Sequence, residues 1–384
     1  MQRGCCMENG KSLRVVVVGA GIVGASIAYH LACRQAQVTV LERHQPGAGA
    51  SSHSFAWLNA FGKTPYAYHD LNRRSMDMWH RFAHDLHVDI GLRWGGDLRW
   101  VHTPEAAAAL QQHVQHLQTW GYPSHLISAE EVQRLEPGLR PGVVSAAALG
   151  PSDGHVEPLK VIAACLQQAR ARGAVVHTAT PVQGLRVSTQ GSTARRVQAV
   201  QTAQGEIPCD AVVLAAGTDT TALAALVGLH IPQEDSPGVV VRTDPRPRLL
   251  QNVSVVYMPA VDATRPEIHL RQLSDGTVQI GEGSQESLAR DDSQAHADTL
   301  LARATHYLPD LAGARALPVP VGYRPMPVDG FPVLGYPEPA PNVYLALMHS
   351  GVTLAPLVGA LATTEIVDGA RVQTFDTYRP ERFG

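Results

Sequence analysis

The sequence predicts an α/β protein in which a Rossmann-like unit on a parallel sheet is interleaved with a smaller α+β unit that contains an antiparallel sheet. The first observation is a β-branched run at 14–18, which leads into a glycine-rich turn and an apolar helical pattern at 25–34. The second is another β-branched run at 37–41, which completes a strand–helix–strand unit. The third is a set of β-branched and alternating runs between 239 and 281, with a hairpin signal at 274–276.

The turn between the first strand and the helix consists of Gly19, Ala20, Gly21, Ile22, Val23 and Gly24. Gly19 allows a tight turn, Gly21 lets the backbone approach a pyrophosphate, and Gly24 lets helix and strand pack closely. The free amides and the positive end of the helix favour phosphate at this point. Glu42 ends the second strand, where a carboxylate can accept hydrogen bonds from ribose hydroxyls. The unit therefore predicts a dinucleotide site, and a glycine turn without a ligand is the alternative.

The chain has 384 residues with 31 basic and 34 acidic side chains, which gives a formal charge of −3. This near-neutral balance gives no electrostatic reason to expect nucleic acid or an anionic membrane surface as a partner. Five cysteines without a CxxC pair predict neither a disulfide scaffold nor a zinc site, and we interpret His80, His84 and His87 as a solvated helix face. Residues 1–12 lack the apolar core of a secretory signal, and no segment reads as a membrane span. We expect a cytoplasmic protein without a metal.

The segment that follows Glu42 helps to choose between NAD and FAD, which the strand–helix–strand unit alone does not. Arg43 begins a stretch that continues through the small and hydroxyl-bearing residues Ala50, Ser51 and Ser52. A flavin needs such a stretch beside its ribityl chain and pyrophosphate. The sequence therefore favours FAD, with Arg43 and the three small residues among its contacts.

Taken together, these residues resemble the D-amino acid oxidase family of FAD enzymes, which includes glycine oxidase, sarcosine oxidase and related dehydrogenases. Further segments fit the family in the same order along the chain: 153–158, 209–217, 322–335 and 349–356. The resemblance thus covers almost the whole chain.

The resemblance implies two interleaved domains. The FAD-binding domain is expected to take residues 13–80, 150–225 and 325–384. The substrate-binding domain is expected to take residues 81–149 and 226–324. No linker-like composition marks a boundary between them, which agrees with interleaving.

The resemblance also implies further contacts to the flavin, at Val182, Ala215, Ala216, Gly217, Ser350, Gly351, Val352 and Thr353. The backbone groups of Gly351 and Thr353 would stabilise negative charge on the reduced ring. We expect the FAD to be non-covalent, because residues 318–323 lack the cysteine that the sarcosine-oxidase type of linkage needs. His53 follows the hydroxyl-bearing stretch, and its register does not clearly match a linking position.

Arg324 is the first candidate for substrate binding, and it is also expected to contact the cofactor. A guanidinium can hold a carboxylate in a bidentate pair, and the matching arginine does so in amino-acid oxidases of the family. A surface salt bridge is the alternative. His349 has the intrinsic pKa to bind substrate or accept a proton, or else it shapes the wall of the site. His53, Tyr257 and His269 are further candidates, with ordinary packing as the alternative.

The resemblance implies oxidation of a C–N bond in an amino acid or secondary amine that carries a carboxylate. Hydride passes to flavin N5, and the imine product hydrolyses. The leading function is an oxidase that uses oxygen and releases hydrogen peroxide. A dehydrogenase that passes electrons to a quinone or a partner subunit is the second, and a non-catalytic flavin-fold assembly factor is the third. A homo-oligomer or a partner electron-transfer subunit is compatible with the first two, and the sequence does not identify the amine.

Overall fold

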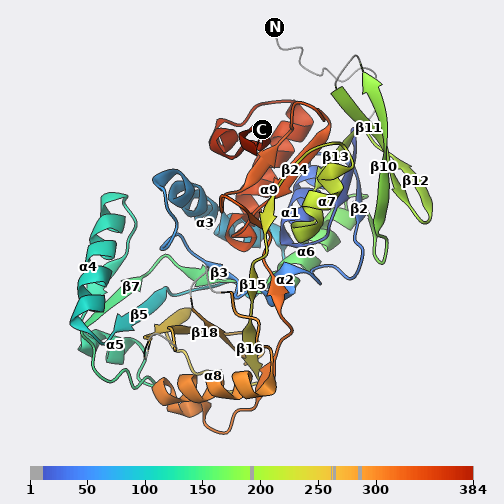
Figure 1. Cartoon of the computed structure of the whole chain (residues 1–384). Helices are drawn as coiled ribbons and strands as arrows, with labels where there is room; N and C mark the ends of the chain where they lie inside the picture. Colours follow the sequence, from blue (N-terminus) through green and yellow to red (C-terminus); the bar gives the residue numbers. More distant parts are fainter. Residues whose placement is uncertain (1–11, 191–193, 261, 263–264, 284–287, 384) are drawn as a thin grey trace.

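The computed structural model describes residues 12–190, 194–260, 262, 265–283 and 288–383 (Figure 1). The expectation that residues 1–12 hold no secretory signal therefore falls, apart from Ser12, outside the described residues. The chain forms two units, which lie one above the other in Figure 1. β1, α1 and α9 belong to the upper unit, and β5, β16 and α8 belong to the lower one.

A six-stranded sheet lies at the centre of the upper unit, in the order β23-β24-β13-β1-β2-β9. All of its pairs are parallel except β23–β24. The strands are β1 (Arg14–Val18), β2 (Gln37–Leu41), β9 (Val175–His177), β13 (Ala211–Leu214), β23 (Val333–Gly335) and β24 (Val343–Leu347). The predicted strand–helix–strand unit is confirmed. β2 pairs with one edge of β1, and β13 pairs with the other edge.

The valine run of β1 is explained by cover on both faces of this sheet. Val15 and Val17 pack in the cluster that includes residues of α1, α6 and α9. Val16 and Val18 pack on the opposite face, against β11 and α7. Because successive strand residues point to opposite faces, a strand covered on both sides needs apolar side chains at every position.

The first face carries α1 (Ile22–Cys33), α6 (Pro158–Arg170) and α9 (Gly351–Asp368), and α3 (Tyr66–Leu86) packs against α9 and α6. The second face carries an antiparallel meander and a short helix: β10 (Val182–Gln190), β11 (Ala194–Thr202), β12 (Gly205–Pro208) and α7 (Thr220–Ala225). The meander extends away from the body of the protein in Figure 1. The helical patterns in the sequence at 159–172 and 354–367 correspond to α6 and α9, and the turn around 204–205 connects β11 to β12.

α9 is long and apolar enough to cross a membrane by length and composition, and 67% of it is buried inside the protein. It packs against α1 and α3. A Cβ on Gly359 would lie 2.2 Å from the Ser26 Oγ of α1, so a small residue is required where these helices touch. The burial and the close contacts describe a core helix of the upper unit.

An eight-stranded sheet forms the lower unit, in the order β20-β16-β19-β18-β17-β5-β7-β6, and the β17–β5 pair alone is parallel among its described pairs. Its strands are β5 (Asp97–Val101), β6 (His125–Ile127), β7 (Ala146–Gly150), β16 (Val240–Thr243), β17 (Val255–Met258), β18 (Ile268–Gln272), β19 (Val278–Glu282) and β20 (Ala316–Pro318). The helices are α4 (Pro104–Thr119), α5 (Ala129–Leu135) and α8 (Gln294–Tyr307). α8 buries Ala297, Leu300 and Ala304 in the core of this unit, and the predicted antiparallel strands between 239 and 281 are confirmed as β16 to β19.

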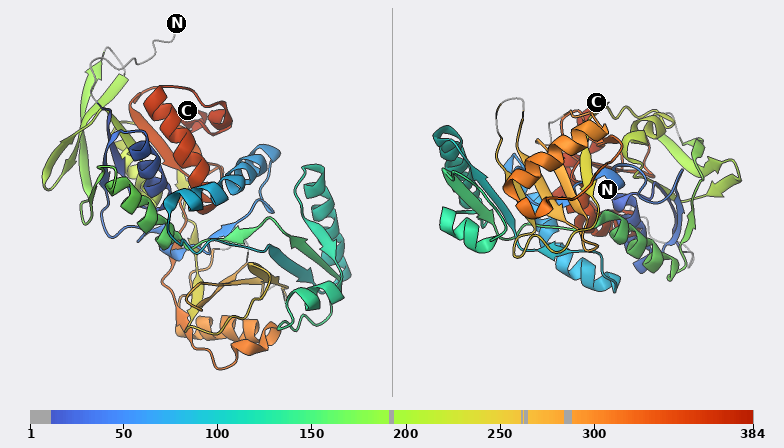
Figure 2. Two further views of the ribbon diagram at one scale, coloured as in Figure 1. Left: turned by 180° about the vertical axis from the view of Figure 1, so that it is seen from behind. Right: turned by 90° about the horizontal axis from the view of Figure 1, so that it is seen from below.

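Short elements connect the two units. The left view of Figure 2 shows the two units from behind. They are α2 (Ala50–His53), β3 (Trp57–Leu58), β4 (Arg93–Trp94), β8 (Gly154–His155), β14 (Gln233–Glu234), β15 (Pro237–Gly238), β21 (Gly322–Tyr323) and β22 (Met326–Pro327). Within the described residues, the 3-10 turns are η1 (Gly217–Asp219), η2 (Pro309–Leu311), η3 (Gln373–Tyr378) and η4 (Pro380–Phe383). The chain passes between the units several times. The predicted boundary at 80/81 falls inside α3, and the exact division into domains stays a prediction.

Candidate functional site

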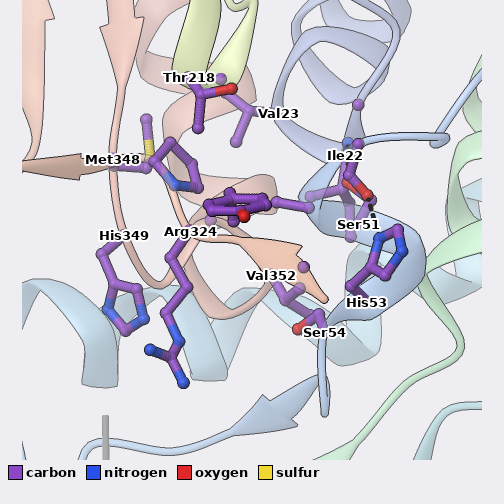
Figure 3. A pocket seen from close by; sticks show the side chains of 18 of the residues that line it. Ile22, Val23, Ser51, His53, Ser54, Thr218, Arg324, Met348, His349 and Val352 are labelled. Carbon is purple, nitrogen blue, oxygen red and sulfur yellow. Dashed lines mark hydrogen bonds between the residues drawn. The ribbon is translucent and has the colours of Figure 1, made fainter. Parts of the chain in front are cut away.

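A cavity of about 880 Å³ lies between the two units (Figure 3). From the upper unit it is lined by the ends of β1, β2 and the residues after β13, and from the lower unit by residues of β16, β17 and β18. Ligands of open α/β sheets bind at the carboxyl ends of the parallel strands. The cavity therefore begins where the sequence predicts a dinucleotide and continues toward the lower unit.

The glycine turn at the end of β1 is shaped by two close backbone approaches. Gly19 has φ +102°, and a Cβ there would lie 2.4 Å from the carbonyl oxygen of Ala215. A Cβ on Gly24 would lie 2.1 Å from the carbonyl oxygen of Gly19. Neither position has room for a side chain, so these two glycines hold the strand, the turn and α1 together.

The start of α1 opens into the cavity. Its N-cap residue Gly21 has no side chain to cap the helix, and the amide of Ile22 donates to the Ser51 Oγ at 3.1 Å. A Cβ on Gly21 would meet only that Oγ, at 3.4 Å. Figure 3 shows Ile22 and Ser51 close together at one end of the cavity. Helix-start amides with open space in front of them form a site for an anion.

Charged side chains mark the outer part of this end. Glu42 accepts from the amide of Ala20 at 2.9 Å and from the amide of His44 at 2.8 Å, so its carboxylate is fixed beside the glycine turn. Arg43 and Asp219 form an ion pair of 2.6 Å, and both residues line the cavity. This arrangement leaves the carboxylate of Glu42 in the wall, where hydroxyl groups of a ligand can reach it.

Arg324 lines the other part of the cavity, together with His349 (Figure 3). Its Nη1 donates to the carbonyl oxygen of Pro237 at 2.7 Å and to the Ser236 Oγ at 3.3 Å. A Cβ on Gly238 would lie 2.5 Å from the Arg324 Nη2, so the guanidinium passes directly over this glycine. Neither acceptor carries a charge, and together they hold the positive group in the wall.

His349 follows β24 and precedes α9. Burial, and then the charges of Lys63 and Arg324, hold the pKa of the His349 imidazole well below its usual range. The Tyr68 hydroxyl donates to the Ser350 Oγ at 3.0 Å, and Ser350 lies within 3.3 Å of the His349 Nδ1. The imidazole is therefore uncharged at neutral pH, and the turn that leads into α9 is tied to α3.

Two further candidates come from the sheet of the lower unit. The rings of Tyr257 and His269 stack at 4.9 Å, and Phe55 meets His269 edge-on at 4.3 Å. Burial, and then the charges of Arg99 and Arg324, lower the pKa of His269 to about 3. A Cβ on Gly281 would lie 2.2 Å from the His269 Nε2, so the ring lies flat on the neighbouring strand.

Comparison with known proteins decides the family. The sequence model of the family described as FAD dependent oxidoreductase (DAO) matches residues 14–365. The chain belongs to this family of FAD-dependent oxidoreductases. The sequence-based prediction of the D-amino acid oxidase family is thereby confirmed, and so are FAD as cofactor and the oxidation of amino acids or amines as the class of reaction.

The chain is similar over most of its length to several members of the family. It is 28% identical to an opine oxidase subunit of Rhizobium meliloti over 96% of this chain and 97% of that protein. It is 29% identical to glycine oxidase of Geobacillus kaustophilus (strain HTA426) over 90% and 91%. The crystal structure of glycine oxidase from Geobacillus kaustophilus matches with a TM-score of 0.82 and 26% identity over 96% of this chain and 98% of that one. Dimethylglycine dehydrogenase of Rattus norvegicus is 26% identical over 68% of this chain and 30% of its own length.

The cavity of this family member fits FAD by its shape and by its donors. Gly21 leaves a cradle at the start of α1 that a Cβ would enter, and the amides of the first turn of this helix lie beside it. Glu42 and Val182 lie in the wall at this end. A pyrophosphate would be held by the amides of the turn, and a ribose by Glu42.

Most of the predicted site residues line this one cavity of the oxidoreductase. They are Gly19, Gly21, Ile22, Val23, Glu42, Arg43, Ala50, Ser51, His53, Val182, Ala215, Ala216, Gly217, Tyr257, His269, Arg324, His349, Ser350, Gly351, Val352 and Thr353. Ala20 and Gly24 lie behind the wall, where their backbone groups shape the turn. The Ser52 side chain bonds to carbonyl oxygens of Ala48 and Gly49 in its own turn. His80, His84 and His87 are exposed on α3 and at its end, as predicted.

Sequence reasoning missed two cations of the oxidoreductase's cavity wall, Arg99 and Lys63. Lys63 is 3% exposed, and its Nζ lies 5.7 Å from the ring centroid of Tyr68. Arg99 lies on β5 and forms an ion pair with Asp97. The sequence does contain an indication of the Asp97–Arg99 ion pair, because the two residues are two positions apart and share one face of a strand. The signal for Lys63 was absent, since it follows no periodic pattern.

Proposed function

We propose that this FAD-dependent oxidoreductase is an oxidase that acts on the C–N bond of an amino acid or secondary amine bearing a carboxylate. The observation that carries this proposal is the position of Arg324, which lies in the wall of the same cavity as the FAD cradle. A carboxylate bound by this guanidinium would fix the substrate at one end. Its amine and the adjacent carbon would then lie within the cavity.

The chain's own residues would orient this substrate. Pro237 and Ser236 hold the Nη1 of Arg324, so the guanidinium does not need to reorganise when the carboxylate arrives. His269 and His349 stay uncharged at neutral pH, because burial lowers both pKa values. We infer that both neutral imidazoles form polar parts of the cavity wall. We also infer that His349 accepts a hydrogen bond more readily than it takes up a proton.

The start of α9 completes the site. Ser350 to Thr353 line the cavity, and the hydroxyl of Thr353 donates to the carbonyl oxygen of Trp57 at 3.1 Å, which fixes the first turn of the helix. When bound, the flavin supplies the redox chemistry by taking up hydride from the carbon beside the amine nitrogen. The positive end of α9 would stabilise negative charge that develops in front of it.

Two relatives favour an oxidase. Glycine oxidase and the opine oxidase polypeptide are proteins that this chain matches over nine tenths or more of both lengths. Dehydrogenase activity with a partner protein is the second candidate. It is supported by the likeness to dimethylglycine dehydrogenase and by the fact that the opine oxidase relative is named as one subunit of its enzyme. Measuring peroxide release and the rate of flavin reoxidation by oxygen separates the two.

The test of the proposal is flavin reduction under anaerobic conditions with a panel of D-, L- and N-methyl amino acids. Arg324→Ala should weaken the apparent binding of carboxylate substrates by about 30-fold or more, as loss of a buried charged pair does, while the protein still binds FAD. Arg14→Ala, which breaks a surface ion pair with Asp210, is the matched control and should reduce its flavin normally. Unchanged kinetics in Arg324→Ala would remove this residue from the site.

A further inference from the structure

A second guanidinium lines the same cavity from the lower unit. The Arg99 side chain donates to Asp97 through Nε at 3.2 Å and through Nη2 at 2.5 Å. Its central carbon lies 3.6 Å from the ring centroid of Phe61 and 4.5 Å from that of Tyr257. The ion pair and the two rings hold this guanidinium in one orientation.

Asp97 occupies only one edge of the Arg99 guanidinium. The Nη1 group makes no hydrogen bond to any described residue, and the side chain is 17% exposed where it lines the cavity. Asp97 itself is 1% exposed, and the neighbouring Asp153 is fully buried and accepts a hydrogen bond from the Tyr122 hydroxyl. Burial, and then the charge of Asp97, hold the pKa of Asp153 well above its usual range, so Asp153 stays uncharged and adds no further anion.

Arg99 and Arg324 act on a shared neighbour. His269 lies in the stack beside Tyr257, and burial, followed by the charges of both arginines, lowers its pKa. Tyr257 lies between the His269 ring, at 4.9 Å, and the Arg99 guanidinium, at 4.5 Å. Both guanidiniums also line the same cavity, so a ligand in it meets both cations.

The other charges of the wall agree with an anionic ligand. Lys63 adds a third cation to the cavity, and its charge also acts on His349. Two carboxylates of the lower unit, Glu267 and Glu282, line the cavity as well, and Glu282 is paired with Arg303. At this end of the cavity the three cations Arg99, Arg324 and Lys63 therefore accompany two carboxylates, one of which is already paired.

We propose that the substrate is a dicarboxylic amine, with one carboxylate bound by Arg324 and a second, distal carboxylate bound by the Nη1 edge of Arg99. This inference rests on the proposed function, because it names the substrate class of the same site. Planar guanidinium groups bind carboxylates through two parallel hydrogen bonds, and the Asp97 pair orients Arg99 for a second such contact. The ion pair with Asp97 also offsets the cost of burying the Arg99 charge when no ligand is bound.

The first test measures binding without turnover. Holoenzyme is titrated with butyrate and with glutarate, which differ by one carboxylate, and the change in flavin absorption gives each Kd. Malonate, succinate and adipate then measure which spacing between carboxylates fits best. We expect glutarate or a neighbour in this series to bind about 10- to 150-fold more tightly than butyrate, the gain from one charged hydrogen-bonded contact. Equal affinities in the unmodified protein would overturn the inference.

The second test removes Arg99 without leaving a buried unpaired carboxylate. In the double variant Arg99→Met with Asp97→Asn, the preference for the diacid should disappear while the Kd of butyrate stays the same. Arg99→Lys keeps the charge and loses the planar fork, so it should keep part of the preference for the diacid. This variant provides the test if the double variant folds poorly. Arg93→Met is the matched control, because Arg93 lies in the same unit and bonds to the carbonyl oxygen of Leu250 outside the cavity wall. A full preference in both Arg99 variants would refute the role of this residue.

A third measurement separates this inference from the proposed function. N-methylglycine and iminodiacetate form a matched amine pair that differs by one carboxylate, and each is mixed anaerobically with the holoenzyme. If iminodiacetate reduces the flavin faster than N-methylglycine does, and this difference disappears in the Arg99→Met/Asp97→Asn variant, both the inference and the proposed function are supported. Flavin reduction by other amines without any preference for the diacid overturns the inference and leaves the function standing. Tight diacid binding without reduction by any amine leaves the anion site standing and overturns the function.

Discussion

The glycine turn at the end of β1 allows a prediction that separates stability from cofactor binding. Gly21 and Gly24 belong to the same turn, and each is replaced by alanine in a separate variant. A Cβ on Gly21 meets only the Ser51 Oγ, at 3.4 Å, and otherwise enters the cavity. A Cβ on Gly24 would lie 2.1 Å from the carbonyl oxygen of Gly19 and 3.4 Å from the Cβ of Ala215. The first change should therefore affect the ligand, and the second should affect the fold.

The structure gives the size of each effect. Gly21 has φ −70° and ψ 178°, which alanine adopts without strain, so its replacement costs the apoprotein only the N-cap difference, about 0.5–1 kcal/mol. Its methyl group would keep the pyrophosphate from the helix amides. Loss of one charged hydrogen bond, about 1.5–3 kcal/mol, would weaken FAD binding about 10- to 150-fold. The clash at Gly24 involves a backbone oxygen that cannot rotate away, so it should cost about 1–3 kcal/mol or more of unfolding free energy.

The assay uses apoprotein for urea unfolding and FAD fluorescence titration for the Kd. Gly138→Ala is the matched control, since its nearest neighbour also lies 3.4 Å from the added Cβ and the residue belongs to the lower unit. We expect Gly21→Ala to unfold nearly as the unmodified apoprotein does and to bind FAD weakly. We expect Gly24→Ala to unfold at a clearly lower urea concentration. A Gly24→Ala apoprotein of normal stability, or a Gly21→Ala protein with normal FAD affinity, would refute the roles given to these residues.

Two further predictions concern pH and the cofactor. His269 stays neutral in the folded protein down to a pKa of about 3, whereas in the unfolded chain it takes a proton below about pH 6.5. The stability that depends on it is therefore complete above about pH 6.5 and falls by up to about 1.4 kcal/mol per pH unit toward pH 3. His269→Asn should reduce the slope of unfolding free energy against pH, and His84→Asn, at an exposed position, should not. We also expect FAD to be non-covalent, so acid precipitation should leave the yellow colour in the supernatant; colour on the pellet would contradict this.

Local sequence was sufficient to predict the glycine turn and the helix start that line one end of the cavity. β1, the turn and α1 are consecutive, so the spacing of Gly19, Gly21 and Gly24 places them in three dimensions without knowledge of the rest of the fold. Ala215 is the exception, because it meets Gly19 through the parallel pairing of β1 with β13. It was predicted only through the resemblance to a family in which the same strand returns to the cofactor.

The substrate end could not be predicted in the same way. Arg99 reaches the cavity because β5 pairs with β17 in parallel, which brings Arg99 opposite Tyr257. No short motif records a pairing between strands more than 150 residues apart. Lys63, in turn, is a buried basic residue in an irregular segment, and its Nζ lies over the ring of Tyr68 in helix α3.

Glycines at the substrate end explain why motif reading identifies only part of this site. Gly238 lies under the Arg324 guanidinium, Gly281 under the His269 ring, and a Cβ on Gly322 would lie 2.3 Å from the Cβ of His53. Each glycine makes room for a larger side chain from another part of the chain, so its role is defined by a partner and not by its sequence neighbours. In the turn after β1, Gly19 and Gly24 make room for backbone, and Gly21 leaves space that is open to the cavity. The geometry of the proposed substrate site therefore depends on pairs of distant residues, and a change at Gly238 or Gly281 would move Arg324 or His269 without a change in the glycine turn proposed to hold FAD.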